Sequence, residues 1–122
     1  MRRGARLCGR AAFVHAVPVV SLVSPRLRDA GFSHAFFTRE GGVSEGPWAS
    51  LSFATNTGDD PAHVAENVRR AADALGVPPA RLYVVSQVHG REVVRLDGDE
   101  ARDDVARREA DATLATRAGE IG

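Results

Sequence analysis

Apolar positions in residues 58–76 recur with the period of an amphipathic α-helix. Asp60 is placed to cap the first turn, Pro61 suits the first helical position, and Gly76 suits the position just past the end. At helical spacing the apolar side chains share one face, which carries Val64, Val68, Ala71, Ala72 and Leu75. The pattern therefore predicts a helix that packs this face against a sheet or another helix.

Several shorter apolar runs predict β-strands around that helix. Four of them are bounded by turn residues and cover residues 17–23, 32–38, 92–96 and 110–116. A fifth run, residues 81–88, is apolar at consecutive positions, which predicts a strand buried on both faces. Residues 97–109 lack an apolar stripe and predict a solvated loop or a short exposed helix. The mixture of elements predicts the α/β fold class.

Residues 39–48 are rich in turn-forming residues. Three glycines and a proline exclude a helix here. The pair Gly41 and Gly42 allows positive φ and lets the backbone approach another group closely. From the residues alone, the segment is either a surface hairpin loop, which is the commoner case, or a place of such close approach.

Composition narrows the class of protein further. The 122 residues are enough for one domain or part of one, and 16 basic and 16 acidic residues give a formal net charge of zero. A neutral chain gives no electrostatic reason to expect a nucleic acid polymer or an anionic membrane as partner. No apolar run reaches the ~20 residues that a membrane helix needs. All basic residues are arginine, which excludes a Schiff-base lysine and a P-loop lysine.

The N-terminal residues and the cysteine content bear on location. Residues 1–16 are rich in arginine and alanine without periodicity, and we predict a disordered leader there. Their basic start resembles a signal peptide, but His15 and Pro18 interrupt the apolar stretch and no clean cleavage site follows. Cys8 is the one cysteine, so an internal disulfide is impossible and a reducing cytoplasm is the simplest compartment.

Among the histidines, His89 is the candidate for chemistry. It ends the apolar run, precedes a glycine and follows Gln87 at strand spacing, so both side chains are expected on one face. Ligand sites gather at strand ends in α/β proteins, and a functional role for His89 is as well supported as a structural one. His34 lies in an apolar run, where a hydrogen-bonded structural histidine is favoured over a ligand.

Four blocks of this sequence, in the same order and spacing, resemble those of the YfiH family. They read HAFFTREGGVSEGPWASL at residues 34–51, GDDPAHVAENVRR at 58–70, QVHG at 87–90 and ADA at 110–112. The family is also labelled peptidoglycan editing factor and laccase-like multicopper polyphenol oxidoreductase. The resemblance implies a mixed α+β layered sandwich, of which residues 17–122 form the N-terminal part of a single, incomplete domain.

The resemblance also implies an activity and a metal. It implies a zinc-dependent purine nucleoside phosphorylase that acts on adenosine, inosine, guanosine and methylthioadenosine and also deaminates adenosine. The zinc is held by two histidines and a cysteine, of which the first histidine matches His89. The other two ligands belong to later blocks that this sequence lacks, and Cys8 lies outside the matched region. A lone histidine cannot hold catalytic zinc, so we expect the chain to be inactive alone.

Two further residues are candidates for substrate binding. Arg39 lies beside the glycine-rich segment, where its guanidinium is suited to phosphate, although an ordinary surface arginine is equally consistent. Gln87 is placed to orient a ligand or substrate, or to make a strand-edge hydrogen bond. The expected partners are a purine nucleoside and phosphate, with the oligomeric state left open.

Two other functions remain as alternatives. One is a non-catalytic half-domain or binding module. The other is the labelled role of a laccase-like copper oxidoreductase or a peptidoglycan-precursor editing factor, with copper as the alternative metal. Copper chemistry ranks last, because a blue-copper site needs two histidines and a cysteine together.

Overall fold

The computed structural model describes residues 17–117, so the leader predicted at residues 1–16 lies outside the described residues. Helices and strands are mixed, which confirms the predicted α/β class. In chain order the elements are β1 (Ser21–Leu22), α1 (Pro25–Asp29), β2 (Phe36–Phe37), the 3₁₀ turn η1 (Gly46–Trp48), α2 (Pro61–Leu75), the 3₁₀ turn η2 (Pro79–Arg81), β3 (Val93–Leu96), α3 (Arg102–Ala106) and β4 (Ala112–Ala115).

The predicted amphipathic helix is confirmed as α2. The Asp60 carboxylate accepts a hydrogen bond from the Ala62 N–H at 2.8 Å, and Gly76 ends the helix in the left-handed conformation with φ of 73°. The helix buries Val64, Asn67, Val68, Ala71 and Ala72. Four of these belong to the predicted apolar face, whereas the buried Asn67 is a polar residue that the apolar pattern did not include.

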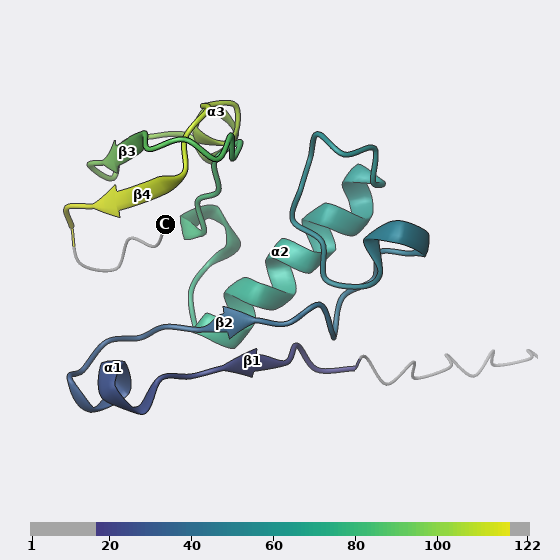
Figure 1. Ribbon diagram of the computed structural model, residues 1–122, viewed down its shortest axis with the longest axis horizontal. Helices are drawn as coiled ribbons and strands as arrows, with labels where there is room; N and C mark the ends of the chain where they lie inside the picture. Colours follow the sequence, from purple (N-terminus) through teal and green to yellow (C-terminus); the bar gives the residue numbers. More distant parts are fainter. Residues whose placement is uncertain (1–16, 118–122) are drawn as a thin grey trace, which may run out of the picture.

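The strands form two separate small sheets, with β1 and β2 near the C-terminal end of α2 and β3 and β4 further away (Figure 1). Strands β1 and β2 are antiparallel, and β3 and β4 are parallel with Val93 opposite Ala112. The strands predicted at residues 92–96 and 110–116 are confirmed. Those predicted at residues 17–23 and 32–38 are present but only two residues long, because most of each run continues as irregular backbone.

The strand predicted for residues 81–88 is wrong. The backbone is mostly irregular there, with isolated bridge positions at Leu82 and Ser86, and Ser86 pairs in parallel with Glu109. Leu82 packs in the core beneath α2, and the next residue, Tyr83, packs in a second core. Consecutive apolar residues therefore serve two different cores, which a sequence run cannot distinguish from a strand buried on both faces.

The second core explains why residues 97–109 are not wholly solvated. Its buried members are Tyr83, Leu96 and Val105, and Val105 projects from α3. The predicted short helix is present, but its full exposure is wrong because Val105 has no exposed surface. One apolar anchor in thirteen residues leaves no periodic signal to detect.

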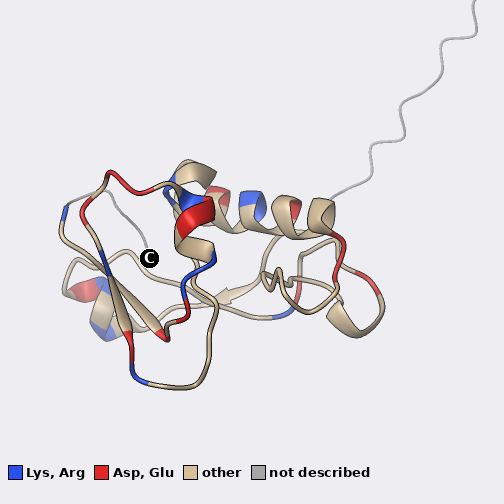
Figure 2. Cartoon of the chain, turned by 90° about the horizontal axis from the view of Figure 1, so that it is seen from above, with Lys and Arg blue, Asp and Glu red and all other residues tan. Residues whose placement is uncertain are grey.

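Acidic and basic residues are interspersed along the chain (Figure 2). This distribution agrees with the zero formal charge of the sequence. Within residues 17–117, no helix combines the length and apolar character that crossing a membrane requires.

Candidate functional site

His89 occupies an exposed turn with unusual backbone geometry. Its φ is 58°, and among residues 17–117 it is the one non-glycine residue with positive φ. The next residue, Gly90, donates its N–H to the Asp111 carboxylate at 2.8 Å. A left-handed non-glycine residue costs about 1–2 kcal/mol, and such strain concentrates at functional sites. The conformation of His89 therefore supports a functional role independently of the sequence blocks.

Gln87 and His89 do not share a strand face. Both residues lie in irregular backbone, so the strand alternation on which that prediction rested is absent. Both residues are exposed. Gln87 instead lines a cavity. Its predicted role in orienting a ligand or substrate therefore rests on the cavity and not on a shared strand face.

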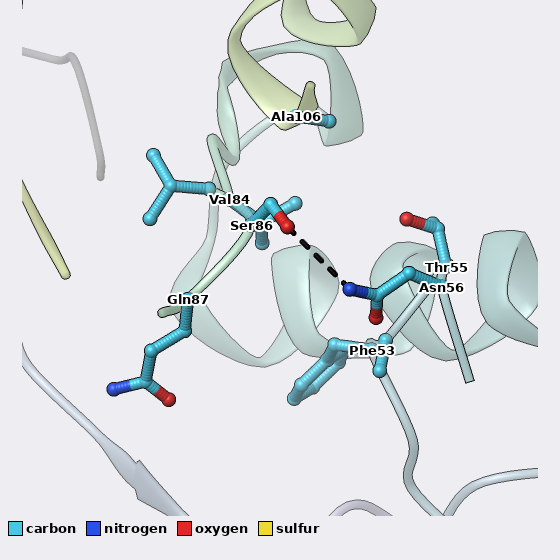
Figure 3. Close-up of a pocket in the computed structure, with 9 residues that line it drawn as sticks. Phe53, Thr55, Asn56, Val84, Ser86, Gln87 and Ala106 are labelled. Carbon is cyan, nitrogen blue, oxygen red and sulfur yellow. Dashed lines mark hydrogen bonds between the residues drawn. The ribbon is translucent and has the colours of Figure 1, made fainter. Parts of the chain in front are cut away.

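The cavity lies between two irregular segments and has a volume of about 350 Å³ (Figure 3). One wall comes from the segment after the glycine-rich loop and the other from the segment before His89. The lining residues are Phe53, Ala54, Thr55, Asn56, Val84, Val85, Ser86, Gln87 and Ala106. The Asn56 amide donates to the Ser86 hydroxyl at 3.4 Å across the cavity. Its volume and mixed lining fall within the range of small-molecule sites.

Arg39 holds the glycine-rich loop closed. Its guanidinium donates from Nε to the Ala49 carbonyl at 2.8 Å, and Nη2 donates to the same oxygen. Its own carbonyl accepts from the N–H groups of Ser50 and Leu51 at 3.0 and 2.9 Å. Arg39 therefore has a structural role in the loop, and its predicted role in phosphate binding stays a prediction.

A buried polar network ties the same loop to α2. The Asn67 amide accepts from the Val43 N–H and donates to the Ser44 hydroxyl and the Ser52 carbonyl, each at 2.8 Å. The Ser44 hydroxyl donates to the Asp59 carboxylate at 2.6 Å. The reasoning from sequence missed these residues. The available signal was an asparagine at a position of α2 next to its apolar stripe, inside one of the matched blocks.

A second link runs through ionised side chains. Arg70 donates to the Glu66 carboxylate at 2.8 Å and to the Gly41 carbonyl at 2.9 Å. Hydrogen bonds from Arg69 and then Arg70 lower the pKa of Glu66 from 4.5 to about 2. Glu66 therefore stays ionised and holds Arg70 against the loop.

Glu66 is expected to make stability depend on pH below neutrality. Its folded pKa is depressed, so its contribution is complete above pH 4.5 and is lost as the pH falls towards 2. The side chain is 33% exposed, and screening limits the effect to about 1 kcal/mol. Thermal melts between pH 7 and 2 should show a shallower acid loss in Glu66→Gln than in wild type. Glu45→Gln, at an exposed acid without a side-chain capping bond, should keep the wild-type slope.

His34 is a hydrogen-bonded structural residue, as favoured from the sequence. Its Nε2 accepts from the Ser24 N–H at 2.7 Å, and its Nδ1 lies 3.0 Å from the Phe32 carbonyl. These contacts engage both ring nitrogens of a neutral imidazole. The ring therefore joins the turn at α1 to the segment that leads into β2.

The described residues do not fit a metal centre by themselves. Within residues 17–117, no three histidine, cysteine or acidic residues come together in a group able to hold an ion. His89 is a single imidazole donor, whereas a catalytic zinc site needs three protein ligands. The described residues therefore supply at most part of a zinc or copper site.

Comparison with known proteins places the chain in a family. Residues 33–121 match the model described as multi-copper polyphenol oxidoreductase laccase. The chain belongs to this family. The match includes the glycine-rich loop, α2 and the His89 turn, and it confirms the resemblance found from the four sequence blocks.

Relatives with assigned names are bacterial proteins called purine nucleoside phosphorylase. The chain is 48% identical over 69 residues to purine nucleoside phosphorylase ORF3 of Streptomyces griseus, covering 56% of this chain and 28% of that protein. It is 39% identical to a Corynebacterium glutamicum relative, covering 69% and 34% of the two chains. It is 38% identical to YfiH of Escherichia coli, covering 69% and 32%. The chain thus spans about a third of the relatives it matches.

Two solved structures share the fold. Hypothetical protein YfiH of Bacillus licheniformis aligns with a TM-score of 0.59 and 26% identity, over 68% of this chain and 33% of that one. YlmD from Geobacillus stearothermophilus aligns with a TM-score of 0.57 and 28% identity, over 98% and 41%. The expected YfiH-type fold, as part of a larger domain, is confirmed.

Proposed function

We propose that this chain forms part of the nucleoside site of a purine nucleoside phosphorylase. The left-handed His89 turn, two residues along the chain from the cavity wall, is the observation that carries the proposal. The names of the relatives supply the reaction, and the cavity supplies a place for a small molecule. Gln87 joins the two features, because it lines the cavity two residues before His89.

The cavity chemistry suits a purine. Phe53 offers an aromatic surface for a planar base. Asn56 and Gln87 offer amides that donate to and accept from the polar edge of the base, and Ser86 offers a hydroxyl. An apolar wall with a few convergent polar groups is the usual construction of such sites.

The reaction itself needs charge stabilisation more than a strong base. In phosphorolysis, a phosphate oxygen forms a bond to C1′ of the ribose as the bond from C1′ to the base nitrogen breaks. The base leaves with the electron pair and takes up a proton, and positive charge develops on the ribose. We propose Arg39 as a phosphate-binding residue, because a guanidinium binds oxyanions through two hydrogen bonds. In that role it would keep both hydrogen bonds to the Ala49 carbonyl and would bind phosphate through its other N–H groups.

The proposal extends to a bound metal and to adenosine deamination. His89 would be one ligand of a zinc ion, with copper as the alternative, and further ligands would have to come from outside the described residues. Adenosine deamination and a cytoplasmic location extend the proposal and rest on the YfiH resemblance and on the single cysteine.

A nucleoside titration tests the proposed function. In ¹⁵N-labelled chain, inosine is expected to shift the signals of Asn56, Ser86 and Gln87, and uridine is expected to shift them less because its base is smaller. Gln87→Ala should weaken inosine binding about tenfold, equivalent to ~1.4 kcal/mol. His63→Ala, in the first turn of α2, serves as a control without effect. Equal shifts with both nucleosides, or none with either, contradict a purine site.

The chain alone is expected to leave inosine intact. One candidate zinc ligand among the described residues is too few for a catalytic ion. Hypoxanthine release from inosine and phosphate, with zinc added, should stay at the level of buffer. A metal-dependent rate that disappears in His89→Ala would show that the chain is active by itself.

A copper oxidoreductase is the second candidate, because the family model carries that description. It requires copper ligands in addition to His89, and the described residues bring none together with it. Oxidation of a phenol by the copper-loaded chain, lost in His89→Ala, would favour this function over phosphorolysis.

A further inference from the structure

The His89 turn is a bulge between two anchored points of a parallel strand pairing. At one end, the Ser86 N–H donates to the Arg108 carbonyl at 2.9 Å, and the Ser86 carbonyl accepts from the Ala110 N–H at 3.1 Å. At the other end, the Asp111 N–H donates to the Glu92 carbonyl at 2.9 Å. The residues between these anchors leave the ladder and project outward.

The Asp111 side chain reaches into this bulge. Its Oδ2 accepts the Gly90 N–H at 2.8 Å. It also lies so close that a Cβ on Gly90 would stand 3.1 Å from the same oxygen. Gly90 directly follows His89, so this bond acts on the peptide unit that sets the left-handed conformation of the histidine.

The second carboxylate oxygen is unusual. Oδ1 of Asp111 is buried and has no hydrogen-bond partner among residues 17–117. An unpaired buried acceptor lowers stability, as does a left-handed histidine. Two unfavourable features meet at this turn, one at His89 and the other on the aspartate that holds the Gly90 N–H, and they indicate that the turn serves a function at some expense of stability.

We propose that Asp111 is a positioning residue for His89. Its Oδ2 holds the Gly90 N–H, and this bond fixes the left-handed backbone of His89 and the direction in which the imidazole leaves the turn. The role rests on the proposed function of His89. The sequence resemblance gave no role to the aspartate of the ADA block. That aspartate is Asp111, which lies 21 residues further along the chain than Gly90.

Backbone measurements on labelled 122-residue chain test the proposal directly. In Asp111→Ala, hydrogen exchange of the Gly90 amide should accelerate about tenfold or more, since the bond that protects it is gone. The three-bond H–N–Cα–H coupling of His89 should move away from the left-handed value. Asp111→Asn keeps an acceptor oxygen and should retain both signals. Asp103→Ala, at an exposed aspartate of α3, is the matched control and should change neither.

The variants also separate positioning from simple loss of stability. Circular dichroism melts are recorded for each variant, and Asp111→Asn decides the matter if Asp111→Ala fails to fold. Loss of Gly90 protection and of the His89 coupling in a folded Asp111→Asn overturns the proposal. Wild-type exchange and coupling in a folded Asp111→Ala overturn it as well.

Inosine binding distinguishes the positioning role of Asp111 from the proposed nucleoside site on which it rests. Inosine should shift the His89 signals in wild type, bind about tenfold more weakly to Asp111→Ala, and recover most affinity in Asp111→Asn. If inosine binds no form of the chain, the proposed function fails, while the Gly90 and His89 measurements still decide the role of Asp111. If inosine binds all forms equally, the positioning role is wrong and the nucleoside site stands.

Discussion

Replacing Asn67 with alanine will lower the free energy of unfolding by about 2–4 kcal/mol. Asn67 is completely buried and makes three hydrogen bonds of 2.8 Å. Alanine would leave the Val43 N–H and the Ser52 carbonyl without these partners and would open a small cavity. The Ser44 hydroxyl would keep its bond to Asp59. The cost is concentrated in the connection between α2 and the glycine-rich loop.

Chemical denaturation of both proteins measures this loss. Asn56→Ala is the matched control, because Asn56 is exposed and its single bond to Ser86 is long, at 3.4 Å. It should change stability by less than about 0.5 kcal/mol. Equal losses in the two variants would mean that the network around Asn67 contributes no more than a surface contact. A further outcome is expected at the loop, where Val43 amide exchange should accelerate in Asn67→Ala.

Helix α2 was predictable because its signals are local. Asp60, Pro61 and Gly76 define its ends by capping chemistry that involves neighbouring residues, and the structure confirms all three. Asn67 was not predictable in the same way. A buried asparagine is satisfied by partners 15 to 24 residues away, and nothing in the local sequence identifies them.

The strand predicted before His89 was wrong for a related reason. The apolar run at residues 81–88 suggested a strand, but its apolar residues divide between two cores. Whether such a run pairs as a strand depends on partners far along the chain, here the segment around Glu109. His89 stays a candidate although the strand before it is absent, because the QVHG block that carries the family resemblance does not depend on that strand. Its positive φ and its link to Asp111 emerge only in three dimensions.

The glycine-rich loop was predictable in its backbone conformation but not in its contacts. The paired glycines left two interpretations open, a surface hairpin loop, which is the commoner case, or a place of close backbone approach, and the structure has the close approach together with a positive φ. Gly41 has φ of 91°, and a Cβ there would overlap the Pro18 carbonyl oxygen. What the backbone approaches was not predictable, and it proves to be other backbone of this chain.

Gly42→Ala is expected to destabilise the chain by about 3 kcal/mol through steric overlap. A Cβ at Gly42 would overlap the Ser50 carbonyl oxygen and stand 2.5 Å from Leu51 Cα. Both atoms belong to the backbone, in which the Ser50 carbonyl accepts from the Ser44 N–H and the Leu51 N–H donates to the Arg39 carbonyl. This backbone cannot rotate away as the end of a side chain would. Gly42 is not in the positive-φ region, so conformational strain contributes nothing to this cost.

Gly31→Ala isolates the opposite effect and is the control for Gly42→Ala. Gly31 has φ of 88° and no atom within 4 Å of an added Cβ, so alanine there costs only the left-handed backbone, about 1 kcal/mol. Denaturation of both variants should therefore show the larger loss for Gly42, although Gly31 has the more restrictive backbone. A smaller loss at Gly42 than at Gly31 would contradict tight packing of the loop. Because Arg39 and Asn67 hold the same loop, a displaced Ser50 should also speed amide exchange at Leu51, whose N–H donates to the Arg39 carbonyl.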